Sequence, residues 1–81
     1  MNRQEAMTVV KESLGSVVPG ADVEILGPTD KFRDALELDS IDFLGFVEAL
    51  AERTGCRIDE DDYASLTTLA DSADLVAGRA P

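Results

Sequence analysis

The chain has 81 residues, of which 44% are hydrophobic, and this composition predicts one globular domain over residues 1–81. Its formal net charge of −10 argues against nucleic acid and anionic membranes as partners. No apolar run approaches the roughly 20 residues of a membrane span, and the first five residues do not resemble a secretion signal. Because one cysteine cannot form an internal disulfide, we expect a cytoplasmic protein. We also expect a monomer.

The acidic residues are concentrated after residue 33. Residues 1–33 hold five acids and four bases, whereas residues 34–81 hold twelve acids and three bases. This distribution favours partner proteins with basic patches, because complementary charge accelerates their encounter. The alternative is that the acidity only aids solubility. The chain has no histidine, so the commonest general base and metal ligand is missing.

A first helix is predicted near the start of the chain. Asn2 is the expected N-cap and Glu5 its reciprocal partner. Apolar residues then recur at helical spacing, at positions 6, 9, 10, 14 and 17. Either Gly15 or the Pro19-Gly20 pair should end this helix.

Residues 18–38 should form a long loop. They contain several turn signals and no strong period, and a connection of about 20 residues is often functional in a compact domain. We expect the loop to be ordered, because four apolar residues could pin it to the core: Ile25, Leu26, Phe32 and Leu36.

The second helix should begin at Asp39 or Ser40, end at Arg53 or Thr54, and be followed by Gly55 as the C-terminal glycine. Its apolar residues form two stripes. One can serve the core and consists of Phe43, Phe46, Val47 and Leu50. The other contains Ile41 and Leu44 and exceeds what the core of a monomer needs. It indicates either a partner surface or a helix buried on all sides.

Two further helices are predicted after residue 58. Residues 60–66 should form a short helix with Tyr63, Ala64 and Leu66 directed inward. Thr68 and Asp71 have the spacing of a capping box for a last helix, which Gly78 should end. The expected fold is all-α: a small four-helix bundle of three main helices and a short third helix, with a long loop after the first.

The most informative motif is Asp39-Ser40-Ile41, followed by Asp42, at the start of the second helix. A hydroxyl in this place is usually only a cap. Here the motif, its acidic surroundings and the four predicted helices resemble the acyl carrier protein family over nearly the whole chain. The lead-in at residues 32–38 and the acidic segment at residues 57–62 also look like that family, as does Thr67-Thr68-Leu69 at the start of the fourth helix.

The resemblance implies a function without catalysis by the chain itself. It makes Ser40 the attachment point of 4′-phosphopantetheine, which a phosphopantetheinyl transferase takes from coenzyme A. Acyl groups would then travel as thioesters between acyl-transferring, condensing or ligase enzymes of fatty acid, polyketide or related biosynthesis. Two alternatives are an aminoacyl or peptidyl carrier on the same fold and an unmodified acidic interaction domain.

The resemblance also assigns two sets of residues around Ser40. Partner recognition is expected from the outward side of the second helix: Asp39, Ile41, Asp42, Leu44, Glu48 and Glu52. Asp39 and Asp42 would also complement the helix dipole. An acyl chain is expected to enter the core among Phe43, Phe46, Val47, Leu50, Ile58, Tyr63, Ala64 and Leu69, provided that the short third helix moves.

Several residues have other interpretations. Cys56 is expected to fill apolar space rather than react. Residues 59–62 lack the glycine and glutamate spacing of a calcium loop, so no metal ligands are assigned and a solvated acidic helix start is expected. Gly45 costs a helix about 1 kcal/mol relative to alanine, and it indicates either close approach by a partner or neutral drift. Arg53 departs from the usually acidic character of this stretch in the family.

Overall fold

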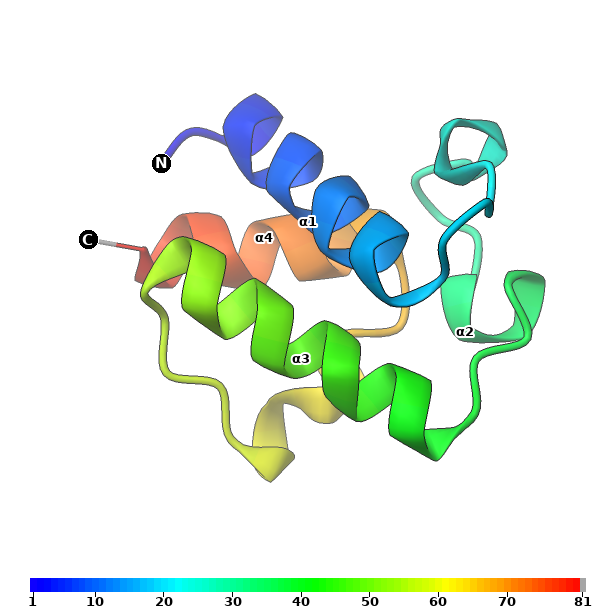
Figure 1. The fold of residues 1–81 in the computed structure, drawn as a ribbon. Coiled ribbons are helices and arrows are strands. Elements are labelled where there is room, and N and C mark those ends of the chain that lie inside the picture. Colours follow the sequence, from blue (N-terminus) through cyan, green and yellow to red (C-terminus); the bar gives the residue numbers. More distant parts are fainter. Residues whose placement is uncertain (81) are drawn as a thin grey trace.

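Three long helices carry most of the chain in the computed structural model, which describes residues 1–80 (Figure 1). They are α1 (Arg3–Val17), α3 (Ser40–Thr54) and α4 (Leu69–Arg79), and α1 packs against both of the others. A short 3-10 helix, η2 (Glu60–Ser65), lies between α3 and α4 in the chain. Residues 1–80 contain no strand, only one isolated β-bridge between Lys31 and Thr68. The predicted all-α bundle is confirmed.

The predicted helix starts are confirmed by their caps. The Asn2 side chain accepts from the Glu5 backbone at 2.8 Å, and the Glu5 carboxylate accepts from the Asn2 backbone at 3.2 Å. At the C-terminal end of α3, Gly55 takes the left-handed conformation, with φ 72°, that favours glycine after a helix. Thr68 caps α4 through the Asp71 backbone N–H at 3.1 Å, but the reciprocal bond of a capping box is not formed.

The structure decides between the two predicted ends of the first helix and corrects the predicted end of the last one. α1 continues through Gly15 to Val17 and stops just before Pro19, so only the second of the two predicted stop signals acts. The backbone of a residue before proline disfavours the helical region, which gives the reason. α4 includes Gly78 and ends at Arg79, whose guanidinium is held by an ion pair with Asp62.

The long loop contains two short helical turns that the sequence did not predict: η1 (Val23–Ile25) and α2 (Phe32–Ala35). It is tied to the segment before α4, because the Phe32 backbone N–H donates to the Thr67 carbonyl at 3.2 Å. The expected pins Leu26 and Phe32 are buried and Leu36 is half-buried, but Ile25 is 75% exposed, so that prediction is wrong. In a 3-10 turn residues three apart share a face; Val23 and Leu26 take the inner one and Ile25 turns outward.

The core lies between α1, α3 and α4. The predicted core stripe of α3 is buried, and Phe46 packs edge-on against Phe32 with ring centroids 5.2 Å apart. Cys56 is buried in this core, as expected of an apolar filler. Gly45 faces α1, since an added Cβ would lie 3.2 Å from Val17 Cγ1. Its close neighbour is therefore another helix of the same chain.

Candidate functional site

Ser40 is the first residue of α3, and its side chain is exposed. The helix start is fixed by the two acids around it. The Asp39 carboxylate accepts from the Asp42 backbone N–H at 2.8 Å, and the Asp42 carboxylate accepts from the Asp39 backbone N–H at 3.5 Å. This capping box leaves the Ser40 hydroxyl outside the capping bonds. The hydroxyl therefore stands at the positive end of the helix dipole and is accessible to another molecule.

Arg33 contacts Ser40 from α2. Its Nη2 donates to Ser40 Oγ at 3.3 Å, and its Cζ lies 4.9 Å from the centroid of the Phe43 ring. The chain returns from α2 to α3 through Glu37, which has a φ of 54°, an uncommon value for a residue other than glycine. Our sequence predictions missed Arg33. The available signal was its position as the last base before Arg53, in an otherwise acidic stretch.

A cavity of about 410 Å³ opens beside Ser40, between α3 and the segment around η2. Besides Ser40 and Arg33, it is lined mainly by apolar side chains: Phe43, Leu44, Tyr63, Ala64, Leu66 and Thr67. Phe43 and Tyr63, which both line it, contact each other edge to face, with ring centroids 5.3 Å apart. Such a cavity is suited to an apolar chain that starts near the serine.

The residues expected to form an acyl pocket fall into two groups. Phe43, Tyr63 and Ala64 line the cavity. The remaining five lie deeper or to the side in the core region: Phe46, Val47, Leu50 and Leu69 are buried, and Ile58 is half-buried against them.

Ala64 was predicted to face inward, but it is exposed at the rim of the cavity. The reason is the 3-10 geometry of η2, in which residues three apart share one face. Leu66 is 1% exposed and Tyr63 packs against the core from the same side, so the intervening Ala64 lies off that face. Leu44, Leu66 and Thr67 were not assigned to the pocket by the sequence, although Leu66 was expected to point inward.

Most of the residues expected to recognise partners are exposed on α3 or at its start. Ile41 is 80% and Leu44 47% exposed, so the second apolar stripe of the helix is not buried. Among the acids, Asp39, Glu48 and Glu52 are exposed and Asp42 is half-buried. The result is a surface of mixed apolar and acidic character that begins at Ser40.

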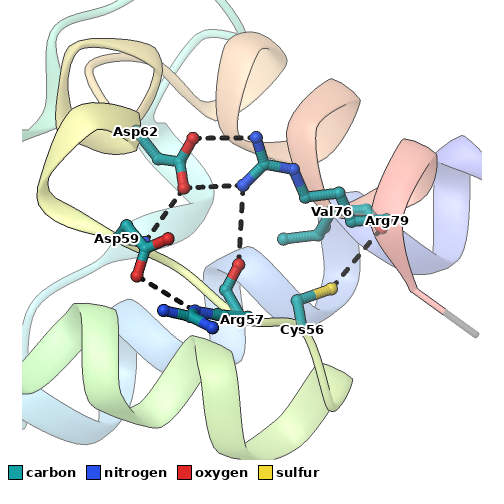
Figure 2. Close-up of polar contacts among 6 residues, drawn as sticks. All are labelled: Cys56, Arg57, Asp59, Asp62, Val76 and Arg79. Atoms are coloured by element: carbon teal, nitrogen blue, oxygen red, sulfur yellow. Dashed lines mark hydrogen bonds and ion pairs between the residues drawn. The ribbon is translucent and has the colours of Figure 1, made fainter.

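Asp62 ties η2 to the last turn of α4. Its carboxylate accepts from Arg79 Nη1 at 2.6 Å and from Nη2 at 2.8 Å, and Arg79 Nη1 also donates to the Arg57 carbonyl at 3.5 Å (Figure 2). The bonds from Arg79, followed by that from the Asp59 backbone, hold the pKa of Asp62 below its usual value. The hydrogen bonds to Asp62 likewise raise the pKa of Arg79.

The expectation of a solvated acidic segment at residues 59–62 is therefore wrong for Asp62, whose side chain is only 14% exposed. No local sequence pattern predicts this pair, because its members are 17 residues apart. Within residues 1–80, no cluster of three or more histidine, cysteine or acidic side chains could hold a metal ion. In the same part of the chain, no helix combines the length and apolar character needed to cross a membrane.

The geometry describes a small helical domain with an accessible hydroxyl at a helix start, and known proteins identify its class. Residues 8–76 match the family model described as "Phosphopantetheine attachment site". The chain is 32% identical over 79 residues to the acyl carrier protein of Acidothermus cellulolyticus, and this match covers 95% of this chain and 90% of that protein. It is 29% identical over 76 residues to the acyl carrier protein of Rubrobacter xylanophilus, covering 94% and 93%.

The chain therefore belongs to the acyl carrier protein family, and its cofactor is a covalently attached 4′-phosphopantetheine. The residues described above fit such a group. An exposed hydroxyl is available for the phosphodiester, a guanidinium lies 3.3 Å from it, and an apolar cavity begins beside it.

Proposed function

We propose that Ser40 carries the 4′-phosphopantetheine arm and that the protein shuttles acyl groups between enzymes of fatty acid, polyketide or related biosynthesis. The observation that carries this proposal is the Ser40 hydroxyl, exposed at the first residue of α3 and next to an apolar cavity. When attached, the arm supplies a terminal thiol on which acyl groups travel as thioesters.

The surroundings of Ser40 indicate that another protein performs the attachment. In the described part of the chain, the hydrogen-bonding partner of Ser40 Oγ is Arg33, a group that donates and cannot accept a proton. The chain has no histidine, and both neighbouring acids are engaged in the capping box. A phosphopantetheinyl transferase would therefore have to supply the base and bring coenzyme A.

The partner surface that we propose is the exposed side of α3, formed by the residues predicted above for recognition. Ile41 and Leu44 offer apolar contact, while Glu48 and Glu52 offer charge for basic patches on transferases and on acyl-transferring, condensing or ligase enzymes. The same acidity disfavours nucleic acid and anionic membranes. We place the protein in the cytoplasm as a monomer, where its single, buried Cys56 stays reduced.

The apolar cavity favours acyl cargo over aminoacyl cargo. We propose that an acyl chain enters between Phe43 and Tyr63, with Ala64 at the rim. The deeper residues Phe46, Val47, Leu50, Ile58 and Leu69 would contact longer chains after a displacement of η2. Each methylene transferred from water into this region would contribute roughly 0.8 kcal/mol.

The attachment is tested by intact-mass measurement after incubation with coenzyme A and a broad-specificity transferase. We expect the wild type to gain one arm and Ser40→Ala to gain none. Ser65→Ala is a matched control, because it removes another exposed serine hydroxyl and should still gain the arm. An unmodified wild type, or a modified Ser40→Ala, would contradict the assignment.

A further inference from the structure

Arg33 stands out because its guanidinium is already placed beside Ser40. Nη2 lies 3.3 Å from Ser40 Oγ, and the guanidinium carbon lies 4.9 Å from the Phe43 ring centroid. Phe43 is buried and therefore offers a fixed ring face, which orients the planar guanidinium through a cation–π contact. Ordering this side chain against a ligand would cost less entropy than ordering a free surface arginine.

Among residues 1–80, Arg33 also has no carboxylate partner, although the surrounding sequence is acidic. In residues 1–80, the ion pairs involve four other bases: Arg3, Lys11, Arg57 and Arg79. Neither Asp34 nor Glu37, its near neighbours in sequence, pairs with it. Of its five N–H donors, one is used in a hydrogen bond, and that bond goes to the Ser40 hydroxyl. The remaining donors are therefore available to an anion at Ser40.

We propose that Arg33 binds the phosphodiester that joins the arm to the protein, which rests on the proposed attachment at Ser40. The phosphorus atom would be bonded to Oγ, the atom that Arg33 already contacts. Attachment replaces a neutral hydroxyl by a group with charged oxygens, and a guanidinium bonds such oxygens more strongly, often through two parallel N–H groups. Arg33 thus provides a phosphodiester-binding site on the chain itself.

The negative charges around Ser40 explain why a base at this position would be useful. Asp39 and Asp42 flank the serine, and the phosphodiester adds another negative charge to the same helix start. The positive charge of Arg33, 3.3 Å from Ser40 Oγ, would offset that repulsion. Because Arg33 and Ser40 line the same cavity, a phosphodiester bound by Arg33 would keep the root of the arm at the cavity mouth. Arg33 is a positioning residue in this account, because it transfers no proton.

The competing explanation is that Arg33 only packs on Phe43 and has no contact with the phosphodiester. Phosphorus NMR of the loaded protein separates the two. We would compare the wild type with Arg33→Gln, Arg33→Lys and Arg53→Gln, each loaded through the transferase and checked by intact mass. Arg53→Gln is the matched control, because it removes the same charge from an exposed arginine in the last turn of α3.

We expect the phosphorus resonance to shift in Arg33→Gln, to shift less in Arg33→Lys and to stay in place in Arg53→Gln. Added salt should move the wild-type resonance toward that of Arg33→Gln and leave Arg33→Gln unchanged, because screening weakens an ion pair. A resonance that is the same in the wild type and Arg33→Gln, with the same salt response, would overturn the proposal.

If Arg33→Gln does not fold, the wild type alone decides. The Arg33 Nε–H resonance should shift on attachment of the arm, and a resonance that does not shift overturns the proposal. Failure of the two proposals looks different. A wild type that gains no arm contradicts the attachment at Ser40. A phosphorus resonance that is the same in the loaded wild type and in loaded Arg33→Gln contradicts only the role of Arg33.

Discussion

The two sides of η2 are held by different forces. On one side, Asp62 accepts two bonds from Arg79, at 2.6 and 2.8 Å, which fasten η2 to the last turn of α4 (Figure 2). On the other side, Tyr63 rests edge-on against Phe43 and borders the cavity beside Ser40. Charge-assisted, bidentate bonds are directional. An aromatic contact next to a cavity can be displaced more easily, since few atoms oppose the movement.

This difference suggests how a small bundle could admit cargo without unfolding. The Arg79–Asp62 ion pair would keep η2 attached while the Tyr63 side opens next to Ser40. Local opening of a short, weakly packed element costs less than global unfolding. The predictions below break or sharpen the comparison of the two sides, beginning with the largest expected effect.

Removing the buried ring of Phe43 should lower the stability of the protein more than any other change considered below. Phe43 is buried and contacts the rings of Phe46 and Tyr63 as well as Arg33. We expect Phe43→Ala to lower the free energy of unfolding by about 3–5 kcal/mol, measured by urea denaturation. Tyr63→Phe is the control, because it keeps the ring, and it should change stability by less than about 0.5 kcal/mol. Equal losses in the two variants would show that Phe43 is not the main support of this side.

Breaking the ion pair should have a smaller and more local effect. We expect Arg79→Gln to speed hydrogen exchange at the backbone N–H groups of Asp62 and Leu66, which close turns of η2. Amides in the middle of α3 should keep their protection. Arg57→Gln is the control, because Arg57 makes an exposed pair with Asp59 and such pairs contribute little. Unchanged exchange in Arg79→Gln would mean that the ion pair does not fasten η2.

The ion pair should also give the protein a measurable acid sensitivity. Bonds from Arg79 lower the folded-state pKa of Asp62 below its ordinary value of 3.8. The stabilisation is therefore present above pH 3.8 and is lost as the pH falls from there through the lower folded-state pKa. The difference in unfolding free energy between the wild type and Asp62→Asn should shrink over this range. A difference that stays constant as the pH falls below 3.8 would contradict the assigned cause.

The smallest expected effect concerns partner binding on the two sides. Glu48→Gln, on the α3 surface, should weaken binding to the transferase by at most about fivefold at low salt, as one surface charge pair allows. The effect should fade at higher ionic strength. Asp61→Asn removes an exposed acid beside the ion pair instead and should leave the affinity unchanged. Similar losses in both variants would indicate that only net charge matters.

The sequence predicted the helices well because their signals are local. Asn2 with Glu5, and Asp39 with Asp42, mark helix starts within four residues, and Gly55 marks an end. The core stripe of α3 followed from its period. Glycine alone does not mark a helix end, since Gly15 and Gly78 both lie inside helices.

The arrangement around the candidate site could be predicted only in part. Arg33 lies beside Ser40 because the chain turns back between them, with Glu37 in a left-handed conformation. The residue type at position 37 does not predict that turn. The ion pair between Asp62 and Arg79 joins residues that are far apart in the chain. Leu66 points inward as predicted, whereas Ala64 is exposed because η2 is a 3-10 helix, whose faces repeat every three residues.

The most direct test of the whole account is a comparison of backbone amide spectra for the protein with a bare arm and with a medium-length saturated acyl group. We predict that the largest shifts occur at Tyr63 and Leu66, next to the cavity, and that the amides of Asp59 and Asp62 move little. The melting temperature should rise with the acyl group. No shift near Tyr63, together with equal melting temperatures, would contradict the proposal that this cavity receives the cargo of an arm on Ser40.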